Sequence, residues 1–170
     1  MGNIDFSGSC IIILLAKMTH TELCNLGARW LKLNGLINWQ KPKYVIVEIE
    51  SVGISQPDIF GFGCSYTQQI EVKVSRSDFL ADKKKHHRKH PHLDVGQLRS
   101  YLCPSGIILL KDLPDNWGLI WIDDKGYFSV LKEPIPQDRN ASDELKIIYS
   151  ILRRIGIKSQ IFSFKNYKEK

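Results

Sequence analysis

The sequence predicts an α/β fold, a layered sheet of mixed strand directions flanked by helices. Apolar residues recur at helical spacing in residues 19–34 and again in residues 142–155. Between them, residues 43–50 and 68–74 alternate apolar and polar positions, as half-buried strands do, and residues 57–63 are predicted as a short strand ended by glycines. The resulting order of helix, three strands, helix, strands and helix is typical of an α/β layered sheet.

The first helix is expected over residues 19–34. Thr19 or Thr21 can cap its N-terminus, and Glu22 stands in the first turn, where a negative charge is favourable. Gly35 follows as a stop signal. The apolar face that supports this helix consists of Leu23, Leu26, Trp30 and Leu33.

Three short strands are expected to follow as a meander. Residues 43–50 are rich in β-branched residues, residues 57–63 end in glycines, and residues 68–74 complete the set. Ser75 then caps a second helix, which loses its regularity in a basic stretch that ends at Pro91.

The last part of the chain returns to strands before a final helix. Residues 99–103 and 106–110 are predicted as short strands, and residues 117–123 and 126–132 as a hairpin. A C-terminal helix is expected over residues 142–155. Its predicted apolar face consists of Leu145, Ile148, Ile151, Leu152 and Ile155.

Length and composition favour one domain. The 170 residues, 43% of them hydrophobic and 25% charged, are sufficient for a single core. We expect this domain over residues 18–158, with an N-terminal extension over residues 1–17 and a tail over residues 159–170. The apolar run at residues 10–16 is too short to cross a bilayer, so no membrane association is expected. It is either a buried strand or part of an upstream segment that precedes a natural start at Met18.

Charge and cysteine usage narrow the class of partner and compartment. The formal net charge of +6 favours an anionic partner such as nucleic acid. No two cysteines have the spacing of a zinc knuckle, and the chain is not dense in cysteine, so neither a structural zinc site nor a disulfide framework is expected. We interpret the cysteines as reduced thiols of a cytoplasmic protein. They are Cys10, Cys24, Cys64 and Cys103.

A set of charged residues lies on the predicted second and third strands. Glu71 and Lys73 are two positions apart, so they point to one face of the strand while Val72 points into the core. If Asp58 lies on the neighbouring strand, all three charged side chains converge. The carboxylates are hard oxygen ligands suited to Mg²⁺ or Mn²⁺, and the backbone carbonyl of Val72 is a further candidate ligand.

Two interpretations of this pattern compete. A glutamate and a lysine two residues apart on a strand often form only an exposed ion pair. Here Glu71 and Lys73 interrupt a buried apolar run, where polar groups need a reason to be present. Together with Asp58 they could supply the metal ligands and the cation that phosphodiester hydrolysis needs. Glu48 and Glu50 share a face of the first strand, and either could be a fourth carboxylate.

These residues carry a resemblance to a known family. Pro57-Asp58, Glu71-Val72-Lys73 and the αβββαβ order resemble the PD-(D/E)XK nuclease superfamily, whose fold is called restriction-endonuclease-like. The resemblance implies a central mixed sheet flanked by helices. It also implies metal-dependent DNA cleavage, with Asp58, Glu71 and Lys73 at the motif positions and Mg²⁺ or Mn²⁺ as the cofactor.

A longer stretch is similar to the MmcB-like DNA repair family. The similarity includes Glu48, residues 71–83 and residues 113–120, and it spans roughly residues 44–134. It implies that Glu48 joins the catalytic set, and that the reaction belongs to DNA repair or to the processing of phage or mobile-element DNA. The alternative from another class is a catalytically inactive nucleic-acid-binding module that keeps the nuclease fold.

The basic stretch between residues 83 and 92 is the candidate contact with DNA. Lysine and arginine bind phosphates by releasing counterions, which would make this stretch a rim beside the active site. The alternative is a solvated loop without a ligand. A homodimer is possible, since cutting both strands of a duplex often uses two copies of an enzyme. The candidate DNA-binding residues are Lys83, Lys84, Lys85, Arg88 and Lys89.

Overall fold

The computed structural model describes residues 18–37, 40–49 and 56–156. The expected N-terminal extension, the C-terminal tail and Glu50 lie outside the described residues. Within them, the helices (α), 3-10 helices (η) and strands (β) follow in this order: α1 His20–Asn34, β1 Tyr44–Val47, β2 Ile59–Phe62, β3 Gln68–Val72, α2 Arg76–Asp82, α3 His86–Lys89, η1 Pro91–Leu93, β4 Leu98–Pro104, η2 Leu110–Asp112, β5 Gly118–Ile122, β6 Phe128–Lys132 and α4 Ala141–Arg154.

The strands of the described chain form one six-stranded mixed sheet, in the order β1-β2-β3-β4-β5-β6. The strands β1, β2 and β3 are an antiparallel meander, β4 pairs parallel with both β3 and β5, and β6 closes the sheet as an antiparallel hairpin with β5. A parallel pair needs a long crossover, which α2, α3 and η1 supply between β3 and β4. The predicted class, an α/β fold with a mixed sheet flanked by helices, is confirmed.

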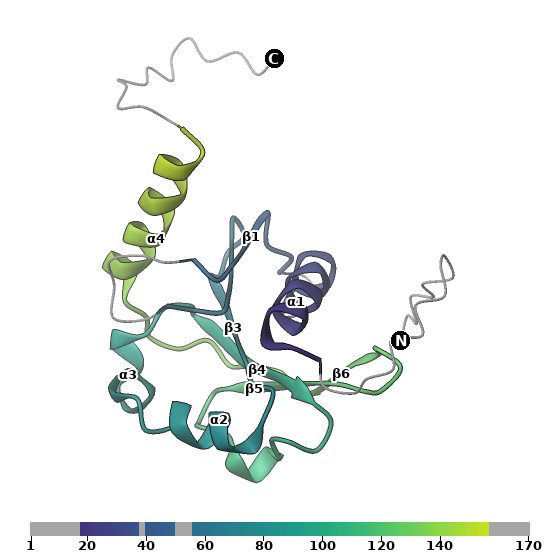
Figure 1. Cartoon of the computed structure of the whole chain (residues 1–170). Helices are drawn as coiled ribbons and strands as arrows, with labels where there is room; N and C mark the ends of the chain where they lie inside the picture. The colour runs from purple at the N-terminus through teal and green to yellow at the C-terminus, as the bar shows by residue number, and fades with distance from the viewer. Residues whose placement is uncertain (1–17, 38–39, 50–55, 157–170) are drawn as a thin grey trace.

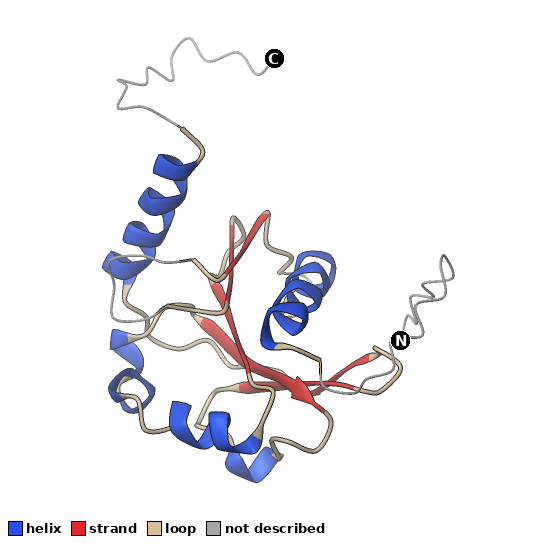
Figure 2. Ribbon diagram, viewed as in Figure 1, coloured by secondary structure: helices blue, strands red, loops and turns tan. Residues whose placement is uncertain are grey.

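Helices cover both faces of the sheet, as Figures 1 and 2 show. On one face, Leu23 of α1 packs in a core cluster with Ile70 and Val72 of β3. On the other face, Phe79 of α2 packs against Tyr101 of β4 with the ring planes at 87° and the centroids 5.1 Å apart. Residues of β3 therefore face α1 and α2 in alternation, which determines what each strand position can contribute to a site.

Two helix starts are fixed by the caps that the sequence predicts. In α1 the N–H of Glu22 donates to Thr19 Oγ1 over 3.3 Å, and the N–H of Thr19 donates to Glu22 Oε2 over 2.9 Å. In α2 the N–H of Asp78 donates to Ser75 Oγ over 3.2 Å. The first capping box makes His20 the first residue of α1, and this position places its ring beside the sheet.

Two predicted elements are wrong. Residues 106–110 form no strand; Ile108 instead packs in the core beneath α2, and its carbonyl accepts a hydrogen bond from Trp121 Nε1 over 2.9 Å. The basic stretch contains a short helix, α3, because Arg88 turns inward to buried carboxylates. In both cases contacts with distant residues decide the conformation.

The apolar face predicted for α4 is only partly correct. Ile151 packs against the core as predicted, but Leu145 and Ile155 are exposed, and the fully buried apolar residue is Ile147, which packs with Phe60 of β2. The helix contacts only the margin of the sheet (Figure 1), so a narrow strip of its surface is covered. No helix in the described ranges is long and apolar enough to cross a membrane.

Candidate active site

The third strand presents a polar face inside the protein. Ile70 and Val72 pack in the core beneath α1, so Gln69, Glu71 and Lys73 turn toward the opposite face. Glu71 is only 2% exposed and Lys73 only 4%. The strand parity predicted for Glu71 and Lys73 is therefore confirmed, and both charged side chains are buried.

Two of the predicted site carboxylates, those of Asp58 and Glu71, lie close to the ammonium group of Lys73. Its Nζ lies 3.3 Å from Glu71 Oε2 and 3.8 Å from Asp58 Oδ2. Asp58 stands one residue before β2, where its Oδ2 accepts a hydrogen bond from the N–H of Val72 over 2.8 Å. Asp82 of α2 adds a third carboxylate, 3.6 Å from the same nitrogen. The carbonyl of Val72 as a metal ligand stays a prediction.

The surrounding charges keep Lys73 protonated. Burial alone would lower the pKa of Lys73, but the carboxylates of Glu71, Asp82 and Asp58 outweigh it, so the pKa is raised. The pKa of Asp58 is also raised, chiefly by burial and then by the charge of Glu71, against the opposing effect of Lys73. At neutral pH Lys73 is thus a cation that can stabilise negative charge, and it is not a base that could accept a proton.

Arg88 is a second buried cation in this site, which corrects its prediction as a DNA contact. Its side chain is 2% exposed, and its guanidinium lies 2.9 Å from Glu71 Oε2 and 2.8 Å from Asp82 Oδ2. It also pairs with Asp94, and it lies 4.9 Å from the ring centroid of Trp117. Arg88 is therefore buried by its contacts with three buried carboxylates, whereas the lysines of the same basic stretch have exposed side chains.

Both carboxylate oxygens of Glu71 have protein partners. Gln69 Nε2 donates to Oε1 over 2.8 Å, whereas Oε2 faces both Lys73 and Arg88. The side chain of Asp58 is 19% exposed and is the accessible carboxylate of the motif. Asp58 is therefore the carboxylate more open to a hard divalent ion, whereas both oxygens of Glu71 are already paired within the protein.

Asp82 anchors α2 to the same network. The hydroxyl of Tyr101 donates to its Oδ2 over 2.8 Å, and Lys85 Nζ lies 2.8 Å from its Oδ1. Burial alone would raise the pKa of Asp82, but Arg88, Lys73 and Lys85 outweigh it, so the pKa is lowered. Asp82 is therefore fully ionised at neutral pH and holds the crossover helix against β4.

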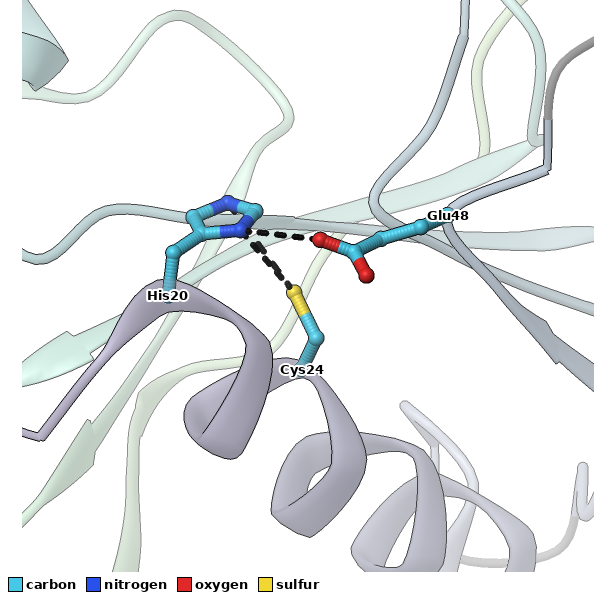
Figure 3. A group of neighbouring side chains, drawn as sticks. All are labelled: His20, Cys24 and Glu48. Atoms are coloured by element: carbon cyan, nitrogen blue, oxygen red, sulfur yellow. Dashed lines mark hydrogen bonds and ion pairs between the residues drawn. The ribbon is translucent and has the colours of Figure 1, made fainter.

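A second group of side chains meets Asp58 from the side of α1. His20 and Cys24 point from α1 toward Glu48, which directly follows β1 (Figure 3). The Nδ1 of His20 lies 3.2 Å from Glu48 Oε1 and 3.6 Å from Cys24 Sγ. The Nε2 of the same ring lies 3.4 Å from Asp58 Oδ2. Glu48, the predicted fourth carboxylate, is thus connected to Asp58 by the ring of His20, which contacts both carboxylates.

Sequence reasoning missed His20 and Cys24 as site residues. The available signal was their spacing of four residues at the start of a helix, which places both on one helical face. Cys24 is fully buried, and its pKa is raised to about 12 by burial and then by the charges of Asp58 and Glu48. A nucleophilic cysteine needs a low pKa and access to substrate, so Cys24 is not one.

The remaining basic residues divide by their contacts. Lys83 Nζ donates to the carbonyl of Asp112 over 2.9 Å and lies 5.6 Å from the ring centroid of Phe79. Lys85 is held by its ion pair with Asp82. Lys84 and Lys89 are exposed, and they are the members of the predicted set best placed to meet an external phosphate.

Comparisons with known proteins extend to the fold and no further. No protein-family model matches the chain, and no curated protein matches it. A solved structure, the SPO1766 protein of unknown function from Silicibacter pomeroyi, is similar to it with a TM-score of 0.58 and 19% sequence identity. The similarity covers 83% of this chain and 91% of that one. At this level of identity the likeness supports a shared α/β architecture alone.

Proposed function

We propose that the protein is a metal-dependent nuclease that hydrolyses phosphodiester bonds in DNA. The observation that carries the proposal is that Lys73 Nζ lies within 3.8 Å of both Asp58 and Glu71. Carboxylates and a cation at one spot are the groups that phosphodiester hydrolysis uses. The resemblance of these residues to the PD-(D/E)XK motif supports the same reaction and a restriction-endonuclease-like core.

Each residue has a distinct role in this proposal. Asp58 offers a hard oxygen ligand to Mg²⁺ or Mn²⁺, and Glu71 becomes a second one when Arg88 releases it. The bound ion would gather negative charge and supply an activated water. Lys73 remains an ammonium and stabilises the charge that develops on the phosphate oxygens. Lys84 would bind the DNA backbone outside the site.

A second candidate function is a catalytically inactive module that binds nucleic acid. The contact that favours it is the one between Arg88 and Glu71, because the guanidinium already balances the carboxylate that a metal ion would need. In this alternative the buried network only stabilises the fold, and exposed lysines such as Lys84 and Lys89 bind the nucleic acid. The two functions differ in one measurable property, the cleavage of DNA.

The deciding experiment compares the wild type with Lys73→Ala, Asp58→Ala and, as a matched control on an exposed lysine, Lys84→Ala. Labelled linear and branched DNAs are incubated with Mg²⁺, Mn²⁺ or EDTA, and Mg²⁺ binding is measured by calorimetry. We expect Lys73→Ala to lower cleavage about 100-fold or more while Mg²⁺ still binds, since lysine is not a metal ligand. Asp58→Ala should lose both cleavage and Mg²⁺ binding.

The control variant and the wild type together decide between the two functions. Lys84→Ala should cleave at a rate close to the wild type once DNA is saturating. Circular dichroism must show that each variant is folded. If the wild type binds DNA yet cleaves no substrate with either ion, the proposal of a nuclease is wrong and the binding module replaces it.

A further inference from the structure

We propose that His20, Cys24 and Glu48 form a binding site for a divalent transition-metal ion of the Zn²⁺ class. Its three ligands differ from the proposed magnesium ligands, although Asp58 contacts both groups, and the proposal does not depend on nuclease activity. The three ligand atoms, one nitrogen, one sulfur and one carboxylate oxygen, lie within 4.8 Å of one another. Figure 3 shows the three side chains converging from α1 and from the end of β1.

Two of the three separations match the edges of a tetrahedron around zinc, and the third, between Cys24 and Glu48, lies within 4.8 Å. Bonds of about 2.3 Å to sulfur and about 2.0–2.1 Å to nitrogen or oxygen, at tetrahedral angles, put nitrogen about 3.6 Å from sulfur and about 3.4 Å from oxygen. In the structure His20 Nδ1 lies 3.6 Å from Cys24 Sγ and 3.2 Å from Glu48 Oε1. The side chains therefore need little movement to enclose an ion.

The other nitrogen of His20 has the partner that metal-binding histidines use. A ligating imidazole generally donates its second N–H to a carboxylate or carbonyl, which fixes the ring and its tautomer. Here Nε2 lies 3.4 Å from Asp58 Oδ2. The N–H of Glu48 also donates to the carbonyl of Asp58 over 2.8 Å, so the same residue positions two of the three ligands.

The conformation of Glu48 is consistent with a positioned ligand. Its φ of 47° lies in the left-handed region, which costs a non-glycine residue about 1 kcal/mol or more. Its side chain is 43% exposed and that of His20 is 35% exposed, so the ion would have one side open to solvent. Three protein ligands and an open position are the pattern of zinc sites that carry a water molecule.

The choice of ion follows from the ligands. Cys24 is a thiol in the absence of an ion and would release its proton to solvent as the metal–sulfur bond forms. The resulting thiolate and the imidazole favour Zn²⁺ or Co²⁺ over Mg²⁺, which prefers oxygen. The competing explanation is a histidine ring hydrogen-bonded between the carboxylates of Glu48 and Asp58, with Cys24 as a core residue, which would bind no metal. The absence of a zinc-knuckle spacing among the cysteines does not bear on this site, because it uses a single cysteine.

The test is a Co²⁺ titration of the full chain followed by absorption spectroscopy. A cobalt–thiolate bond gives a charge-transfer band in the near ultraviolet, and tetrahedral Co²⁺ gives intense visible bands. We expect one equivalent of Co²⁺ to produce both, and Zn²⁺ to displace it. Cys24→Ser should abolish the charge-transfer band, whereas Cys64→Ser, the matched control, should leave it unchanged.

Further variants are needed because Cys24 is buried, and Cys24→Ser could lose the band by unfolding the protein. His20→Gln and Glu48→Gln change partly exposed positions and should weaken Co²⁺ binding at least tenfold in proteins that melt as the wild type does. Asp58→Asn should weaken it about 10- to 100-fold, as loss of a ligand-orienting carboxylate typically does. A wild type that shows no thiolate band, or a band that survives Cys24→Ser, overturns the proposal. Lys73→Ala should keep the band whether or not the protein is a nuclease.

Discussion

Replacing Arg88 by methionine should be among the most destabilising single changes in this chain. The substitution keeps an apolar stem of similar length and removes the cation that contacts Glu71, Asp82 and Asp94. Removing one partner of a buried ion pair typically costs about 3–5 kcal/mol, because a buried charge is left uncompensated. Lys73 stays within 3.6 Å of two of the three carboxylates, so we expect the lower end, about 3 kcal/mol.

The assay is urea unfolding followed by tryptophan fluorescence. With a slope of about 2 kcal/mol per molar urea, a loss of about 3 kcal/mol shifts the midpoint by about 1.5 M. Lys89→Met, one residue along the same helix but exposed, should change stability by less than about 0.5 kcal/mol. Arg88→Lys keeps the charge but loses the forked geometry, so it should fall between the two. Equal midpoints for Arg88→Met and Lys89→Met would refute the role assigned to Arg88.

Two further predictions concern charge. The pKa of Asp82 is lowered in the folded protein, so the stabilising effect of its charge is complete above the unfolded pKa of about 3.9 and is lost as the pH falls below that value. Asp82→Asn should therefore flatten the dependence of the urea midpoint on pH between about pH 5 and 2. A pH dependence equal to that of the wild type would contradict this prediction. Replacing Lys84 and Lys89 by alanine should reduce the slope of log K for duplex DNA against log salt by about 0.9 for each phosphate that the protein no longer neutralises, with Lys125→Ala as the control. An unchanged slope would mean that these lysines are only solvated.

The parts of the fold that the sequence predicts correctly have local causes. The caps at Thr19 and Ser75 are made by residues three positions away, and the alternation of β3 follows from the geometry of a strand. The segment at residues 106–110 is predicted as a strand because it is rich in apolar residues, but only Ile107 and Ile108 pack in the core with Phe79 of α2. Leu145 is predicted to face the core for the same kind of reason. Because α4 buries only a narrow strip of its surface, helical periodicity alone does not identify which apolar residues are covered.

The candidate site divides in the same way. Glu71 and Lys73 could be predicted because they lie two residues apart at the end of β3, and Asp58 because it directly precedes the neighbouring strand. The burial of Arg88 could not be predicted, because one of its partners, Asp94, lies outside the basic stretch and is brought near only by the folded crossover. The pairing of His20 with Glu48 joins residues 28 positions apart, so nothing short of the fold could reveal it.

The arrangement of β4 between two parallel neighbours bears on how the chain folds. The pairs β2–β3 and β5–β6 join segments separated by short connections, and we expect such contacts to form early because the entropy lost on closing their loops is small. β4 can pair only after the crossover from Val72 to Leu98 has closed and the segment from Pro104 to Gly118 has returned. We therefore expect the docking of β4 to limit the folding rate. On this view we expect the buried network around Arg88 to form late, because Tyr101 of β4 donates a hydrogen bond to Asp82 within it.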